Sequence, residues 1–229
     1  MNRESPSPER TAMAARRGSG VELLSVFGVT VGLPLMLTIV AGRAGSFDLG
    51  QRRLLSTLAL EAVVVVLLWP WLAWRGWSFR RIAGAPEPLD VLRGLGLVGL
   101  AYAAYYFSAL TWAAFSPRSY DALFAAVPTG VASFKVVAAL CIVNPVFEEF
   151  LWLAYGVTAF ERFGIRYAVI ASVALRTTVH AYQGVVALIG IVPLGIVFTV
   201  YYARTKRLWP AIVAHVVFDA IALASVTRR

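Results

Sequence analysis

Cysteine and charge are both scarce in this sequence. The single cysteine, Cys141, excludes an internal disulfide and leaves no Cys-rich metal motif, and its apolar surroundings predict a buried core residue. Charged residues make up 14% of the 229 residues, whereas a soluble domain keeps about a quarter. The sequence also lacks an internal repeat, a Gly-rich phosphate loop and the His-Glu-x-x-His zinc motif. We therefore do not expect a soluble, disulfide-bonded or phosphate-loop protein.

Long apolar runs fill the chain instead. Hydrophobic residues account for 59% of it, and the mean hydropathy is +0.73. The runs are about 20 residues long and do not alternate with period two, so they predict transmembrane helices rather than barrel strands. We expect an all-α, polytopic transmembrane helix bundle of about seven helices, six to eight if the segment 116–130 changes the count. The predicted runs are 22–42, 54–74, 89–113, 131–160, 165–180, 185–203 and 208–226.

The basic residues set the expected topology. The net charge is +9, and most Lys and Arg residues lie between the apolar runs, a pattern typical of loops on an anionic membrane surface rather than of nucleic-acid binding. Their excess on one side predicts a cytoplasmic N-terminus, and the Arg- and Ala-rich composition favours a bacterial inner membrane. We expect residues 1–20 to be a disordered cytoplasmic tail, residues 21–229 a single transmembrane domain, and residues 131–226 its functional core. The segment "RGWSFRRIAG" (75–84) predicts a basic surface piece.

Ionisable side chains inside the last apolar runs are the strongest functional signal. A carboxylate near the bilayer centre costs roughly 2.5–3.5 kcal/mol, so such groups face a bundle interior and usually mark function. Any one alone is as well explained by a hydrogen bond between helices, but together they favour a site. Spacings of four residues put two pairs on shared helix faces. The side chains are Glu148 and Glu149 in "NPVFEEFLWLAYG", Arg176 and His180 in "LRTTVHAYQG", and His215 and Asp219 in "HVVFD".

These residues resemble the CPBP family of membrane proteins, which includes type II CAAX-prenyl proteases and bacteriocin-processing relatives. The family carries Glu-Glu-x-x-x-Arg, Phe-x-x-x-His and His-x-x-x-Asn/Asp on three successive helices. In this chain "EEFLWL" resembles the first motif, "RTTVH" the second and "HVVFD" the third, over 144–219. The resemblance implies an intramembrane endopeptidase that hydrolyses a membrane-anchored or lipid-modified protein, with membrane lipids as its surroundings and no nucleic-acid partner.

The resemblance also implies roles for the motif residues. Glu148 would be the general base, and His180 would share or polarise the attacking water. His215 and Asp219 would form the oxyanion site, with the aspartate orienting the imidazole. No cofactor is favoured, although Glu148, His180 and His215 remain open as zinc ligands. Straight helices leave these groups up to about 12 Å apart in depth, so either helix tilt or an earlier start of the seventh helix is required.

Two departures from the family pattern leave alternatives open. Leu153 stands where the first-motif arginine belongs, and Arg176 stands where the second-motif phenylalanine belongs. We predict that Arg176 reaches Glu149 from the neighbouring helix and replaces the lost ion pair. A degenerate, non-catalytic scaffold or immunity protein is the alternative reading. A proton-coupled transporter is a third reading, but the sequence shows neither repeated halves nor matching broken helices. The oligomeric state is not indicated.

Overall fold

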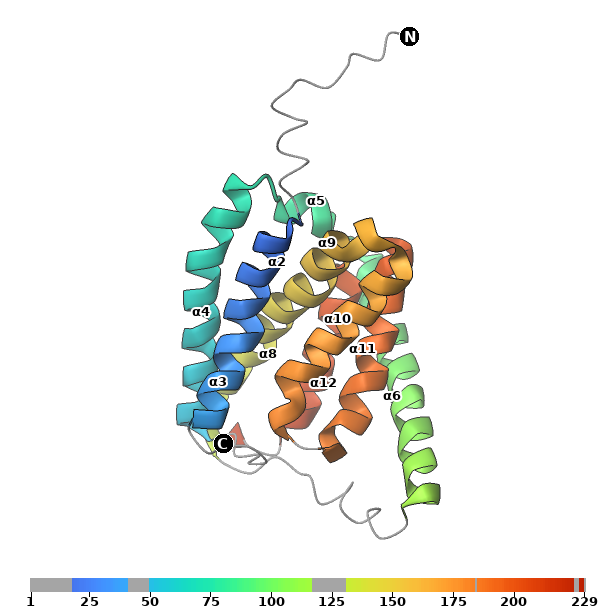
Figure 1. Ribbon diagram of the computed structural model, residues 1–229. Helices are drawn as coiled ribbons and strands as arrows, with labels where there is room; N and C mark the ends of the chain where they lie inside the picture. The colour runs from blue at the N-terminus through green and yellow to red at the C-terminus, as the bar shows by residue number, and fades with distance from the viewer. Residues whose placement is uncertain (1–17, 41–49, 117–130, 184, 225–226, 229) are drawn as a thin grey trace.

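A computed structural model describes residues 18–40, 50–116, 131–183, 185–224 and 227–228 of the chain. The described part is an all-α bundle in which tilted helices pack side by side (Figure 1). The predicted N-terminal tail up to residue 17 and the segment 117–130, which left the helix count open, lie outside the described residues.

Each of the seven predicted apolar runs forms a helix or a series of joined helical segments, with ends close to those predicted. These are α2, η1 and α3 (Gly20–Phe27, Gly28–Gly32 and Leu33–Val40), α4 (Gln51–Trp74), α6 (Leu89–Phe115), α8, η3 and α9 (Phe134–Glu149, Phe150–Val157 and Thr158–Phe160), α10 (Ile165–His180), α11 (Val185–Thr205) and α12 (Trp209–Leu223).

Short elements connect and close the bundle. The predicted basic surface piece contains a one-turn helix, α5 (Phe79–Ala83), and two 3-10 turns, η4 (Glu161–Phe163) and η5 (Ala181–Gln183), flank α10. Two-residue strands, β1 (Ala132–Ser133) and β2 (Thr227–Arg228), pair in parallel register.

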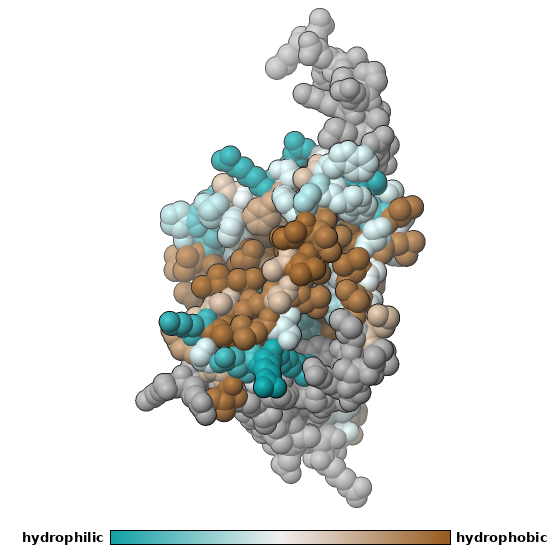
Figure 2. Space-filling view, turned by 90° about the vertical axis from the view of Figure 1, so that its left-hand side faces the viewer, coloured by the Kyte–Doolittle hydropathy of each residue, from teal (hydrophilic) through white to brown (hydrophobic). Residues whose placement is uncertain are grey.

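The surface of the bundle matches a lipid environment. Within the described residues, four helical stretches are long and apolar enough to cross a membrane, at Gln51–Trp74, Leu89–Phe115, Phe134–Phe163 and Ala187–Thr205. On α4, Val66 and Leu67 are 69% and 63% exposed. Figure 2 shows apolar side chains gathered in a band with hydrophilic residues above and below it. Burying such side chains in water-free hydrocarbon is favourable, so the protein is an integral membrane protein.

The helix that carries the two glutamates changes its winding directly after them. α8 continues into a π-helix, η3, in which residues 151–157 are all buried. Pro145, inside α8, has no N–H to donate, which weakens the regular ladder just before the change. The Ser172 hydroxyl of α10 donates to the Trp152 carbonyl at 2.7 Å and so stabilises one carbonyl of the π-helix. Such π segments occur often at functional sites.

A close contact between α6 and α12 fixes where α12 lies. A Cβ added at Gly94 would come within 2.7 Å of the Val213 side chain and 2.9 Å of the Pro210 carbonyl. Gly96, two residues further on, has no atom within 4 Å of its added Cβ. The close packing of α6 against α12 through a small residue therefore involves Gly94 and not Gly96.

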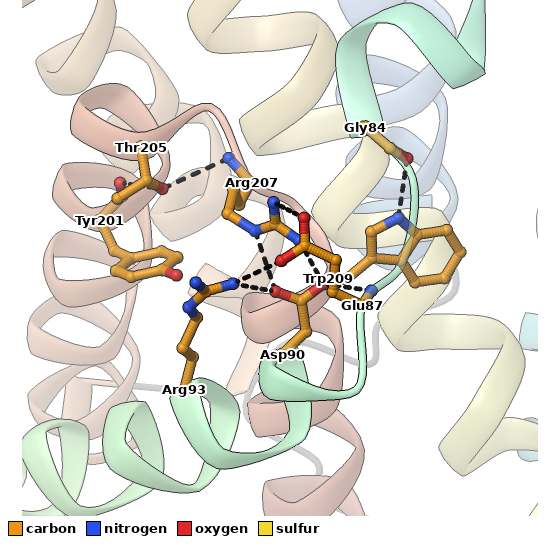
Figure 3. Close-up of polar contacts among 8 residues, drawn as sticks. All are labelled: Gly84, Glu87, Asp90, Arg93, Tyr201, Thr205, Arg207 and Trp209. Carbon is orange, nitrogen blue, oxygen red and sulfur yellow. Dashed lines mark hydrogen bonds and ion pairs between the residues drawn. The ribbon is translucent and has the colours of Figure 1, made fainter.

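Charged residues fasten the same two helices at the membrane surface (Figure 3). Arg207, in the loop before α12, donates to both oxygens of Asp90 at 2.9 and 2.8 Å and to Glu87 at 2.7 Å. Arg93 donates to the same two carboxylates at 3.0 and 3.1 Å. Hydrogen bonds from Arg207 and then Arg93 lower the pKa of Glu87 below its usual 4.5. The Trp209 indole donates to the Gly84 carbonyl at 2.9 Å, which adds a second tie.

A buried glutamate fastens the first helix. The Glu22 side chain is fully buried and accepts hydrogen bonds from the Trp77 indole at 2.9 Å and the Tyr155 hydroxyl at 3.1 Å. It also forms an ion pair with Arg75 and accepts from the Gly18 N–H at 2.9 Å. The carboxylate is thus matched by a cation and neutral donors, as burial requires.

Candidate active site

Helices α8, α10 and α12 bring the predicted site residues together. All six lie in side-chain contact with at least one other member of the set. The difference in depth that straight helices would give is absent, because α8 and α10 run obliquely through the bundle (Figure 1). The contacts fall into a buried group around Glu149 and a more accessible pair formed by Glu148 and His180.

Glu149 is the centre of the buried group. Its Oε1 atom accepts from Arg176 Nη2 at 2.6 Å and lies 2.6 Å from His215 Nδ1. The side chains of Arg176 and Glu149 are 3% and 0% exposed. The ion pair that the sequence predicts between α8 and α10 is therefore present. The same carboxylate also joins α12, so one glutamate ties three helices together.

His215 lies between two carboxylates. Its Nδ1 atom contacts Glu149, and its Nε2 atom lies 3.4 Å from Asp219 Oδ1, one helical turn along α12. The expectation that Asp219 orients the imidazole is therefore incomplete, because the shorter contact comes from Glu149. A charge-assisted N–H···O bond is typically about 2.7–2.9 Å long, so the Glu149 contact is the stronger of the two.

Glu148 and His180 form the second pair. His180 Nε2 lies 3.7 Å from Glu148 Oε1, and its Nδ1 lies 2.8 Å from the Arg176 carbonyl oxygen. A carbonyl oxygen only accepts, so Nδ1 must carry the proton. In the neutral ring, Nε2 is then an acceptor that faces a carboxylate oxygen. The gap is too long for a direct hydrogen bond, so both acceptor atoms remain open to a water that contacts the pair.

Burial separates the two groups. The side chains of Glu148, His180 and Asp219 are 13%, 18% and 21% exposed, whereas those around Glu149 are 10% exposed or less. The Oε2 atoms of both glutamates are buried and have no hydrogen-bond partner among the described residues. The accessible group can meet water and a substrate, and the buried group can hold it in place.

The position of the missing arginine is apolar. Leu153 is fully buried in η3 and packs in a hydrophobic cluster with Ala154, Val157 and Phe198. Arg176 lies over the Phe198 ring, with its guanidinium carbon 5.9 Å from the ring centroid. In this chain the cation that pairs with Glu149 therefore comes from α10, and position 153 in η3 is part of the hydrophobic core.

One further buried residue near this site belongs to none of the three motifs. Glu61, in the middle of α4, is 5% exposed and lies within electrostatic range of Glu148, Asp219 and His215. Its signal in the sequence is a lone glutamate in the apolar run 54–74, with no motif around it. Only the packing of α4 against α8 reveals which way it points.

A zinc site would need three ligands that converge. Across the described ranges, no group of three His, Cys, Asp or Glu residues is arranged to hold a metal ion. Both ring nitrogens of His215 face carboxylates, so the imidazole does not fit the ligand role that the zinc alternative gives it.

Comparison with known proteins supports the same assignment. Residues 130–221 match the family model of type II CAAX prenyl endopeptidases, Rce1-like. No curated protein and no solved structure matches the chain. The matched segment includes all three motifs, so the resemblance that they predict is confirmed. Residues 130–221 are therefore similar to the Rce1-like type II CAAX prenyl endopeptidases, a similarity that supports a membrane-embedded protease.

Proposed function

We propose that the protein is an intramembrane endopeptidase that uses a water molecule, activated by Glu148 and His180, to cleave a membrane-associated or lipid-modified protein. The family match supports a protease, and the arrangement of side chains supports this mechanism. The single observation that carries the proposal is the pairing of a carboxylate with an imidazole whose other nitrogen is held by the Arg176 carbonyl.

That pairing suits a water nucleophile. A carboxylate oxygen and an unprotonated Nε2 are both acceptors, so a water between them would donate one hydrogen to each. Its lone pair would then point away from both groups, toward a substrate carbonyl. Glu148 would take the proton during attack and return it to the leaving amine, a role that contributes roughly 10²- to 10⁴-fold in rate.

The buried group supplies the second requirement, stabilisation of the oxyanion. His215 Nε2 lies 3.4 Å from Asp219, beyond ordinary hydrogen-bond length, so an N–H at this position would be available to donate to a developing negative charge. Glu149 holds the opposite nitrogen and thereby orients the ring. Arg176 balances the charge of Glu149.

The location of the site indicates the kind of substrate. Glu148 lies roughly 21 Å along α8 from its first residue, Phe134, inside a helical stretch long enough to span the membrane. A substrate must therefore bring its peptide bond to the membrane, either in a transmembrane segment or next to a lipid anchor. Both classes belong to the proposal.

The test is cleavage of a panel of membrane-anchored peptides, with and without a prenyl group, by purified protein in lipid. Cleavage that is lost in Glu148→Gln and His180→Ala and unaffected by a zinc chelator is the expected result. Loss of cleavage with chelator would replace the proposal with a metal mechanism. No cleavage by folded wild-type protein would refute a protease.

One observation favours a second function. Leu153 is fully buried in place of the motif arginine, as in a degenerate relative that binds a membrane partner without cleaving it. Two observations oppose this reading. Arg176 provides a cation at Glu149, and the third motif, "HVVFD", matches the family pattern fully. The cleavage panel separates the two functions, since a scaffold would bind the peptides and leave them intact.

A further inference from the structure

The buried acidic residues of this protein differ in their partners. Glu22 pairs with Arg75, Asp90 with Arg207, and Glu149 with Arg176. Glu61 has no ion pair within the described ranges, and its buried Oε2 atom has no hydrogen-bond partner there. Such a group is costly in a lipid-embedded helix bundle, and a cost of this kind usually has a functional reason.

Glu61 faces the site rather than the lipid. The buried residues of α4 are Leu54, Glu61, Val64 and Leu72, which form one stripe along the helix. Leu54, at one end of that stripe, packs with Val137 and Leu140 of α8, and α4 and α8 lie in contact. Glu61 is roughly 15 Å along α4 from its start at Gln51, near the middle of a span of about 36 Å. It therefore lies at a depth where lipid supplies no hydrogen-bond partner.

The neighbours of Glu61 connect it to the chemistry. Glu148, Asp219 and His215 lie within its electrostatic range, and they come from the two helices proposed to activate water and stabilise the oxyanion. The Oε2 atom of Glu148 is also buried without a partner. Two carboxyl groups that interact electrostatically, on α4 and α8, thus each have a buried oxygen without a hydrogen-bond partner among the described residues. α4 lies outside the segment that matches the protease family.

A substrate segment in this region also has polar groups without hydrogen-bond partners. A peptide bond can be cleaved only when its segment is unwound, and an unwound segment at membrane depth has main-chain N–H and C=O groups without partners. A carboxyl group accepts hydrogen bonds, and donates one when protonated. A main chain is present in every substrate, whereas a cationic side chain would itself be costly at this depth.

We propose that Glu61 is a substrate-binding residue that hydrogen-bonds the main chain of the substrate next to the scissile bond. This inference rests on the proposed protease function for its kinetic consequences, but the binding step can be measured without cleavage. It adds α4 to the site as the wall that faces the motif helices.

Two substitutions test it against a structural role. Glu61→Leu removes the hydrogen bond and fills the same space with an apolar side chain, whereas Glu61→Gln keeps an acceptor and a donor. Losing a hydrogen bond of this kind should weaken substrate binding about tenfold to a hundredfold in Glu61→Leu, and Glu61→Gln should stay within about threefold of wild type. The midpoint of thermal unfolding should not fall in Glu61→Leu, because an unpaired buried polar group is replaced by an apolar one. Leu58→Ala, one turn away on the same packed face, is the matched control for altered helix packing.

The experiment measures affinity for a membrane-anchored peptide in the Glu148→Gln background, beside KM and kcat in otherwise wild-type protein. The expected result is weaker binding and a higher KM for Glu61→Leu only, without loss of thermal stability. Unchanged affinity in Glu61→Leu overturns the proposal. An equal loss of affinity in Glu61→Gln and Glu61→Leu overturns the proposal in favour of a required charge. A loss of both stability and affinity in Glu61→Leu, matched by Leu58→Ala, overturns it in favour of a packing role. Absence of cleavage by wild type would refute the protease function, while the affinity comparison would still decide the role of Glu61.

Discussion

Replacing Arg176 tests the buried group around Glu149, because the contribution of Arg176 to the free energy of unfolding can be worked out from its contacts. Its guanidinium lies 2.6 Å from Glu149, and both side chains are almost completely buried. Removing one partner from a buried ion pair leaves the other charge uncompensated, at a cost of about 3–5 kcal/mol. His215 remains as a second partner of Glu149, so we expect Arg176→Leu to lower the free energy of unfolding by about 3 kcal/mol.

The effect of Arg176→Leu on the free energy of unfolding should depend on whether Glu149 is present. In a Glu149→Leu background the arginine is itself an unpaired buried charge, so adding Arg176→Leu should leave stability unchanged or raise it. Denaturant unfolding in mixed micelles measures all four proteins of this double-mutant cycle. The exposed pair Lys206–Glu161, with side chains 44% and 40% exposed, is the matched control and should give a coupling below about 1 kcal/mol. If Arg176→Leu cost the same in both backgrounds, the ion pair would not be what holds α8 and α10 together.

Three other features give measurable expectations. Gly94→Ala should lower the free energy of unfolding by about 1–3 kcal/mol because its Cβ would lie 2.7 Å from the Val213 side chain of α12. Gly96→Ala, which has open space around its Cβ, should be neutral or slightly stabilising. Equal effects of the two substitutions in denaturant unfolding would contradict the contact at Gly94. The pKa of Glu87 is lowered in the folded protein, so its ion pairs stabilise the fold fully above its ordinary pKa of 4.5. That stabilisation is lost as the pH falls through the pKa of the folded protein. In thermal scans from about pH 6 to about pH 3, wild type should therefore lose its stability advantage over Glu87→Gln. A constant advantage across that range would show that Glu87 is not paired with Arg207 in solution. Ser172→Ala should lower the free energy of unfolding by about 0.5–1.5 kcal/mol in the denaturant assay because it removes one buried hydrogen bond between α10 and the π-helix. No change would mean that this hydrogen bond does not stabilise the fold.

The helices could be predicted because lipid leaves the backbone few choices. The run from Leu54 to Trp74 ends within a few residues of the observed α4, since hydrocarbon thickness sets both the length and the composition of a span. The ion pair of Arg176 with Glu149 could be predicted for a different reason. One cation was missing from a motif and another had appeared one helix away, so the two exceptions explained each other.

Other parts of the site depend on information that local sequence does not carry. Glu61 is separated from Glu148 by more than 80 residues, and only helix packing makes them neighbours. The contact of Glu149 with His215 was missed because the depth of each group was reckoned from straight, untilted helices. The π-helix after Glu149 likewise depends on how α8 packs, and its sequence resembles that of any apolar helix.

The central claim is that Glu148 and His180 act together on one water molecule, and single-turnover cleavage of a membrane-anchored peptide tests it most directly. Glu148→Gln and His180→Gln should each lower the cleavage rate by roughly 10²- to 10⁴-fold. Because both groups serve the same step, the double variant should be no slower than the slower single variant. Cleavage that survives either substitution, or losses that multiply in the double variant, would contradict a shared water and with it the mechanism proposed for this protein.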